Sequence, residues 1–196
     1  MSTKHLDLGC GRLPRNPYSA SEVFGIDIAD HHDLPQVLRA DLTVQPIPFG
    51  DAQFDSVSAY DFLEHIPRQW PNATDGGSRL PFVELMNEVW RVLRPGGRFY
   101  ASTPAFPHPE AFVDPTHVNI ITPQTHRYFC GPKPAAAMYG FHGRFKVLRV
   151  DMARPVASTL YVPPAARSRL VQLKRQWETR LGRLSHVIWE FEAELA

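Results

Sequence analysis

The stretch Leu6-Asp-Leu-Gly-Cys-Gly11 decides the fold of this 196-residue chain. A short apolar run over 5–8 ends at once in glycine, which predicts a strand that passes into a tight turn. Glycine in such a turn lets the backbone approach a ligand without a Cβ in the way. Pro14 and Pro17 follow before the next apolar segment, so we expect this connection to be mostly loop and not a regular helix.

The segments that follow alternate between strand and helix patterns. Further strands are predicted over 23–28, 36–41, 54–60, 98–103, 145–150 and, more weakly, 156–162. Apolar spacing of three and four predicts a helix over 80–93, which ends at Pro95-Gly-Gly97, and shorter helices are expected from about Phe62 and from Thr122-Pro123. This order predicts an α/β fold: a doubly wound, Rossmann-like, mostly parallel sheet of seven strands.

Composition indicates a globular, soluble chain. The 21 basic and 20 acidic residues give a net charge of only +1, so bulk nucleic acid is not indicated as a partner, although it is left open. Two cysteines are too few for a disulfide scaffold or a four-thiolate zinc site. No apolar run reaches the roughly 18 residues of a membrane span, and no secretory signal is visible. We therefore expect a cytoplasmic protein.

Polar residues close several of the predicted strands. Asp27 ends the second strand, Asp41 follows the third, and Tyr60-Asp61 ends the fourth. In a doubly wound sheet, ligands bind beyond the carboxyl ends of the strands. The glycine turn and these residues are therefore expected to share one cleft.

This ordered set resembles the motifs of class I S-adenosylmethionine-dependent methyltransferases over about residues 5–104. The elements that carry the resemblance are Leu6-Asp-Leu-Gly-Cys-Gly11, Asp27, Asp41-Leu42, Phe54-Asp-Ser-Val, Leu63-Glu-His-Ile and Arg91-Val-Leu-Arg-Pro-Gly-Gly-Arg-Phe. The resemblance implies a small bacterial type of methyltransferase that binds S-adenosylmethionine. It implies a methionine site at Asp7, Gly9 and Gly11, a ribose site at Asp27, an adenine site at Asp41 and Leu42, and Tyr60 under the sulfonium, with Cys10 and Ile28 completing the set.

The element Asp61-Phe-Leu-Glu64-His65 follows the fourth strand. Residues i, i+3 and i+4 share one helical face, so two carboxylates and an imidazole are expected together beside the methyl group. The pattern resembles the Glu-x-x-Glu-His element of metal-assisted O-methyltransferases. A second imidazole, His117, lies in a loop that is expected to reach over the cleft.

Three interpretations of these residues stay open. In the first, His65, assisted by Glu64 and His117, deprotonates a hydroxyl acceptor. In the second, Asp61, Glu64, His65 and His117 hold Mg²⁺ or Mn²⁺, which lowers the pKa of the acceptor. In the third, the residues are structural. The predicted function is O-methylation of a small-molecule or glycan hydroxyl, and the alternatives are an NAD(P)-dependent oxidoreductase and a non-catalytic cofactor-binding protein.

The predicted organisation is a cofactor-binding domain over 1–162 followed by a helical extension over 163–196. Within the domain, residues 104–142 are expected to form an insertion that covers the acceptor. A solvated helix face is the default interpretation of the basic stretch 167–183. The tail also carries apolar residues that can pack on the domain or on a second subunit of a homodimer: Trp177, Ile188, Trp189 and Phe191.

Overall fold

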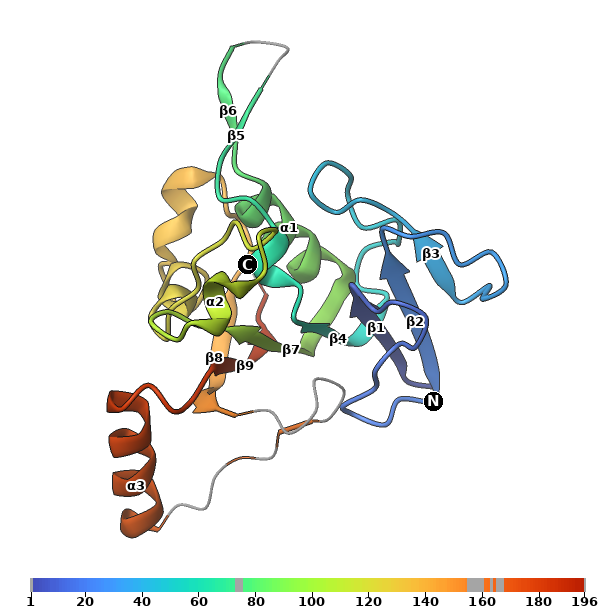
Figure 1. Cartoon of the computed structure of the whole chain (residues 1–196). Helices are drawn as coiled ribbons and strands as arrows, with labels where there is room; N and C mark the ends of the chain where they lie inside the picture. The colour runs from blue at the N-terminus through green and yellow to red at the C-terminus, as the bar shows by residue number, and fades with distance from the viewer. Residues whose placement is uncertain (1, 73–75, 155–160, 163, 165–167, 196) are drawn as a thin grey trace.

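The computed structural model describes residues 2–72, 76–154, 161–162, 164 and 168–195 (Figure 1). Within these residues, seven strands form one sheet in the order β3-β2-β1-β4-β7-β9-β8. Their bounds are β1 Lys4–Leu8, β2 Glu22–Asp27, β3 Val37–Arg39, β4 Phe54–Tyr60, β7 Leu93–Pro104, β8 Phe145–Ala153 and β9 His186–Ala193. The neighbours from β3 to β7 pair in parallel, and β9 is antiparallel to both β7 and β8. The prediction of a Rossmann-like, mostly parallel seven-stranded sheet is confirmed.

The helices are short, and a small hairpin projects from the body. The helical elements are α1 Pro81–Val92, α2 Glu110–Val113, α3 Arg169–Arg180, and the 3₁₀ turns η1 Leu63–His65, η2 Thr125–Tyr128 and η3 Ala135–Tyr139. The hairpin pairs β5 Trp70–Pro71 with β6 Ser78–Arg79. The helix predicted over 80–93 is confirmed as α1. The helices predicted at Phe62 and Thr122 shrink to single 3₁₀ turns, the first because Pro67 cannot continue a helix.

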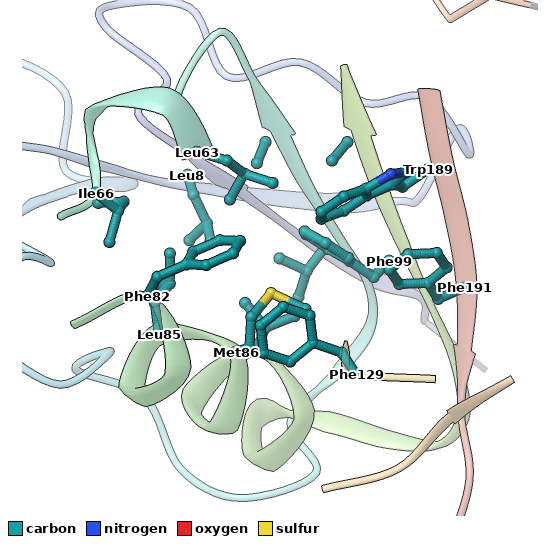
Figure 2. Packing of buried hydrophobic residues seen from close by; sticks show 14 of the residues in the cluster. Leu8, Leu63, Ile66, Phe82, Leu85, Met86, Phe99, Phe129, Trp189 and Phe191 are labelled. Carbon is teal, nitrogen blue, oxygen red and sulfur yellow. The ribbon is translucent and has the colours of Figure 1, made fainter. Parts of the chain in front are cut away.

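One face of the sheet is apolar and packs against α1. Phe82, Leu85 and Met86 of α1 point toward Phe99 and Trp189 on the strands (Figure 2). All five side chains are buried. Helix α1 exists because its apolar residues fall on one side at helical spacing, and burying that side against the sheet provides most of its stability.

The opposite face of the sheet combines buried polar side chains with a second, smaller hydrophobic cluster around Tyr60 and Tyr100. In the strand register, His5 and Asp7 of β1 align with Ser56 and Ser58 of β4, and all four are buried. The His5 ring contacts both serines, at 2.7 and 2.9 Å, and the Ser58 hydroxyl donates to Asp7 over 2.6 Å. Hydrogen bonds between these side chains therefore stabilise this face of the sheet, as apolar packing stabilises the α1 side.

The prediction of a helical extension over 163–196 is wrong for its second half. Residues 169–180 form α3, but His186–Ala193 form β9, inside the sheet. Val187, Trp189 and Phe191 face the core, and Ile188 between them packs in the cluster on the opposite face, which is the period-2 geometry of a strand. The weaker strand predicted over 156–162 falls mostly outside the described residues, and Tyr161 and Val162 are not in a strand. Among the described residues, no helix combines the length and apolarity needed to cross a bilayer.

Candidate functional site

The glycine turn after β1 opens toward solvent. Gly9 and Gly11 both have positive φ, at 63° and 57°, which L-residues with a side chain rarely adopt. A Cβ on Gly9 would lie 2.5 Å from the Phe62 ring, whereas a Cβ on Gly11 would meet no atom of the described residues within 4 Å. Cys10 between them is buried and donates its N–H to Ile26 in β2. Gly11 therefore borders an open cradle at the carboxyl end of β1.

Asp27 is tied directly to this turn. Its Oδ2 accepts the Gly11 N–H at 2.7 Å, and its Oδ1 accepts the Ala29 N–H at 2.9 Å. His31 Nε2 also lies 3.6 Å from Oδ1. A carboxylate oxygen has a second lone pair, so Oδ2 can still accept from a ligand hydroxyl. Next to it, the apolar side chain of Ile28 is 65% exposed. Two residues predicted from separate strands, Gly11 and Asp27, are thus brought together.

Asp7 is buried under the turn. It accepts the Arg15 N–H at 2.8 Å and the Ser58 hydroxyl at 2.6 Å, and burial raises its pKa to about 6. The Arg15 guanidinium lies 3.7 Å from Asp7 and over the Tyr60 ring. Tyr60 packs on Tyr100, and its hydroxyl is buried with no hydrogen-bond partner among the described residues. Asp7 therefore supports the turn from below and is not exposed in the cradle.

Asp41 and Leu42 follow β3. The Asp41 carboxylate accepts from the N–H and the hydroxyl of Thr43, at 3.0 and 2.6 Å. Leu42 is part of the hydrophobic core. At this end of the sheet, only the Asp41 carboxylate and the local backbone are available to a ligand, because the Leu42 side chain is already packed.

Glu64 in η1 is buried, with a side chain 1% exposed. Its Oε2 accepts the Thr103 hydroxyl at 2.6 Å, and its Oε1 lies 3.9 Å from His117 Nε2. Burial raises the pKa of Glu64 to about 7. The Glu64 carbonyl accepts the N–H groups of both Val118 and Asn119 at 2.9 Å, so the backbone of η1 anchors the loop that carries His117.

His65 is oriented by a relay to Asp114. The Thr116 hydroxyl donates to Asp114 at 2.6 Å and lies 3.0 Å from His65 Nδ1. The hydrogen bonds from Thr116 hold the pKa of Asp114 below its usual range. Since the charged carboxylate only accepts, Thr116 must accept from His65, which sets the proton of the neutral ring on Nδ1. The lone pair of His65 is then on Nε2, and the centroids of the His65 and His117 rings are 4.9 Å apart.

Glu64, His65 and His117 offer ligand atoms that all lie within 4.8 Å of one another. Both Glu64 Oε1 and His117 Nδ1 are buried without a hydrogen-bond partner among the described residues. One carboxylate and two imidazoles suit Mn²⁺ or another first-row transition metal better than Mg²⁺, which prefers oxygen ligands. The residues therefore fit a divalent cation, although the set differs from the predicted one.

Asp61 does not join this cluster. The helical turn begins only at Leu63, so Asp61 lies before it, and the i, i+3, i+4 geometry does not apply. Its φ of 47° is a conformation that Asp tolerates better than most residues. Its carboxylate instead lies 3.0 Å from His186 Nε2, and His186 Nδ1 lies 2.8 Å from the Ser185 hydroxyl.

His186 is a polar group of the site that the sequence analysis missed. It begins β9, opposite Pro104 of β7, which brings it to the same edge of the sheet as Asp61. The sequence signal here is a run of strand-forming residues, Val187-Ile-Trp189 and Phe191, which favours a strand but does not give its neighbours.

An aromatic cavity of about 550 Å³ lies beside η1 and the start of α1. Arg68 lines the cavity and donates to the Asn119 side chain. The Asn119 N–H in turn donates to the Glu64 carbonyl, so the cavity lies next to the cluster of Glu64, His65 and His117. Its aromatic lining is Phe82, Tyr128, Phe129 and Tyr139. Of the other aromatics between 104 and 142, Phe106 and Phe112 form an exposed pair, and Phe141 is buried in the core.

Comparison with known proteins gives one family match. Residues 6–101 are similar to the methyltransferase domain family. The match covers just under half of the chain and agrees with the resemblance seen in the sequence. No curated protein matches the chain in a sequence search.

Several solved structures share the fold at low sequence identity. An S-adenosylmethionine-dependent methyltransferase from Archaeoglobus fulgidus is 14% identical, with a TM-score of 0.57, over 97% of this chain and 86% of that one. One from Mesorhizobium loti is 15% identical, with a TM-score of 0.54, over 97% and 91%. The YcgJ protein from Bacillus subtilis is 14% identical, with a TM-score of 0.53, over 100% and 93%. At these identities the likeness shows the fold alone.

Proposed function

We propose that this protein is a methyltransferase that moves a methyl group from S-adenosylmethionine to a hydroxyl oxygen of a small-molecule or glycan acceptor. The observation that carries the proposal is the junction of the glycine turn with Asp27, where an open cradle at Gly11 adjoins a carboxylate with free lone pairs. When bound, the cofactor supplies an electrophilic methyl group. The chain has to hold the acceptor oxygen in line with that methyl and remove its proton.

The cofactor assignment follows the carboxyl edge of the sheet. Asp27 accepts the ribose hydroxyls, and the exposed side chain of Ile28 offers an apolar surface beside them. Gly9, Cys10 and Gly11 provide backbone against the methionine part, with Asp7 holding the turn from below. Asp41 flanks the adenine, and only the backbone of Leu42 contributes because its side chain is buried.

His65 is the group that we assign to the acceptor proton. Its Nδ1 is engaged with Thr116, so Nε2 is the atom that takes the proton from the hydroxyl as the oxygen–carbon bond forms. Asp114 stabilises the resulting imidazolium through Thr116. Glu64 and His117 lie next to the His65 ring and assist this proton transfer.

We assign the acceptor to the aromatic cavity beside η1. Aromatic side chains pack well against the apolar faces of rings, including sugar and phenol rings. Arg68 and Gln69 line the same cavity and can hydrogen-bond to hydroxyl groups. This location fits the predicted role of residues 104–142 as the cover of the acceptor.

A divalent cation held by Glu64, His65 and His117 is the second candidate for activating the acceptor. Glu64 Oε1 and His117 Nδ1 are buried without a hydrogen-bond partner among the described residues, which favours a bound cation. A bound cation would lower the pKa of the acceptor hydroxyl. His65 would then be a ligand and not the base, so the two candidates are mutually exclusive.

Calorimetric titration with S-adenosylhomocysteine tests the cofactor site. Asp27→Ala should weaken binding by about 1.5–3 kcal/mol, roughly tenfold or more, because it removes hydrogen bonds to a charged acceptor. Asp51→Ala, a surface carboxylate paired with Arg91, is the control and should bind normally. Equal affinity in both variants would remove the ribose assignment, and tighter binding of NAD would favour an oxidoreductase.

Turnover with a panel of hydroxyl acceptors tests the chemistry. His65→Ala should lower kcat by about 10²–10⁴-fold and leave cofactor affinity unchanged, and the exposed His142→Ala serves as control. If a chelator abolishes activity and Mn²⁺ restores it, a bound cation, and not His65, activates the acceptor hydroxyl. Cofactor binding without turnover on any acceptor would favour the non-catalytic alternative.

A further inference from the structure

Helix α3 carries its apolar side chains on the outside. Leu170, Leu173, Trp177 and Leu181 are spaced by three, four and four residues, so they form one stripe along the helix. They are exposed to 80%, 62%, 57% and 48%. Figure 1 shows α3 as an arm at the lower left, beyond β8 and β9. The stripe, defined by these four residues, is therefore an apolar surface presented to solvent.

The opposite face of α3 is polar and faces the body of the protein. Gln172, Arg175, Gln176 and Thr179 line a cavity of about 460 Å³ between the helix and β8. Arg175 donates to the Met152 carbonyl in β8. This arrangement is the reverse of an ordinary surface helix, in which the apolar side faces the core and the polar side faces water. Packing among the described residues therefore does not explain the stripe.

Basic side chains border the stripe. On a helical wheel, Arg169 and Arg180 lie on one side of it and Lys174 on the other, and the Arg183 guanidinium lies over the Trp177 ring at 5.3 Å. The one acidic residue of α3, Glu178, lies one turn after Lys174 on the same flank of the stripe and is partly buried. The helix is thus locally cationic in a chain whose net charge is only +1.

We propose that α3 is an interfacial helix that binds the surface of a membrane containing anionic phospholipids. A leucine and tryptophan stripe bordered by arginine and lysine, on a helix of low overall hydrophobicity, is the pattern of helices that lie in the headgroup region. The apolar side chains enter the acyl boundary, and the cations meet the lipid phosphates, each adding attraction to an anionic surface.

Pairing of α3 with a second copy of itself is less favourable. Two such stripes face to face would bring Arg169, Lys174 and Arg180 of one copy against the same cations of the other. Like charges at such an interface repel. An anionic surface neutralises them instead, so charge complementarity selects the membrane over the homodimer.

Sedimentation with lipid vesicles tests the proposal. The full chain should bind vesicles that contain phosphatidylglycerol and phosphatidylcholine, bind pure phosphatidylcholine at least tenfold more weakly, and lose binding as salt is raised. Binding should shift the tryptophan emission to shorter wavelength, and Trp177→Phe should remove the shift, because Trp177 is the tryptophan in the stripe.

Two matched variants test whether vesicle binding depends on the stripe or on any exposed apolar side chain. Leu173→Glu should reduce binding at least tenfold, whereas Met138→Glu, at an apolar side chain 76% exposed outside α3, should not. Both sites are exposed, so thermal unfolding should be unchanged. Absence of binding to anionic vesicles, or equal loss in both variants, would overturn the proposal. A dimer in light scattering that Leu173→Glu converts to monomer would assign the stripe to self-association and overturn it as well.

Discussion

The two faces of the central sheet are both buried, but different forces bury them. On the α1 side, Phe99, Trp189 and their neighbours pack as an apolar layer. On the other side, His5, Asp7 and Ser58 form a chain of hydrogen bonds, and Tyr18 reaches Glu190 across the strands. The same strands supply both layers, because alternate residues point to opposite faces.

The two faces of the sheet have different roles. The apolar face provides stability through burial of surface. The polar face runs from the interior to the glycine turn, so its carboxylate Asp7 supports the candidate cofactor site. Breaking each face should therefore give different signatures in stability and in its pH dependence.

The largest expected effect is the loss of an aromatic side chain from the apolar face. Trp189→Ala should lower the free energy of unfolding by about 3–5 kcal/mol, because it removes buried surface and leaves a cavity. Trp189→Phe should cost less than about 1.5 kcal/mol, since the buried Nε1 has no hydrogen-bond partner among the described residues to lose. Urea unfolding followed by circular dichroism measures both, and similar losses in the two variants would contradict the idea of a purely apolar face.

Removal of Asp7 should come next in size. Asp7→Ala leaves the Arg15 N–H and the Ser58 hydroxyl without their acceptor, at a cost of about 1–3 kcal/mol for each stranded donor. The same variant should bind S-adenosylhomocysteine more weakly, because the glycine turn loses its support. Stability equal to that of the wild-type chain would show that the polar face is held by solvent and not by this network.

The pH dependence of stability isolates the polar face. Burial raises the pKa of Asp7 from 3.8 to about 6, so its contribution falls as pH rises between these values. Burial lowers the pKa of His5 from 6.5 to about 4, so its contribution rises with pH over that range. The two oppose each other in the wild-type chain.

Single substitutions should separate these opposing contributions. Relative to the wild-type chain, Asp7→Asn should gain on the order of 1–3 kcal/mol in free energy of unfolding between pH 4 and pH 6. His5→Gln should lose stability over the same interval, because the rising contribution of His5 is gone. Parallel pH profiles for the two variants would refute the assigned burial of one of these groups.

The smallest expected effect comes from the rim of the polar face. Tyr18→Phe removes the hydroxyl that donates to Glu190 at 2.9 Å and should cost about 1 kcal/mol. Tyr139→Phe, at an exposed tyrosine that lines the aromatic cavity, is the matched control and should be near neutral. Equal effects in thermal unfolding would indicate that the Tyr18 hydrogen bond contributes nothing.

The sequence predicted the frame of the molecule well where local rules suffice. The strand before Gly9, the α1 helix and the order of elements follow from residue spacing and from turn residues, which act over a few positions. The proximity of Gly11 and Asp27 could also be predicted, because the turn after β1 and the end of β2 belong to neighbouring parallel strands, and such strands end at one edge of the sheet. The helical prediction for the tail failed because it rested on composition and passed over the strand-forming residues 187–191.

What the chain determined by itself is therefore the set of elements and the edge at which its polar residues gather. Only the tertiary structure decided that Asp61 turns to His186 and away from Glu64, and that Thr116 orients His65. These partners are separated by 51 to 125 residues in the sequence. Contacts at such separations depend on how strands and loops assemble in space, and no local pattern of residues encodes them.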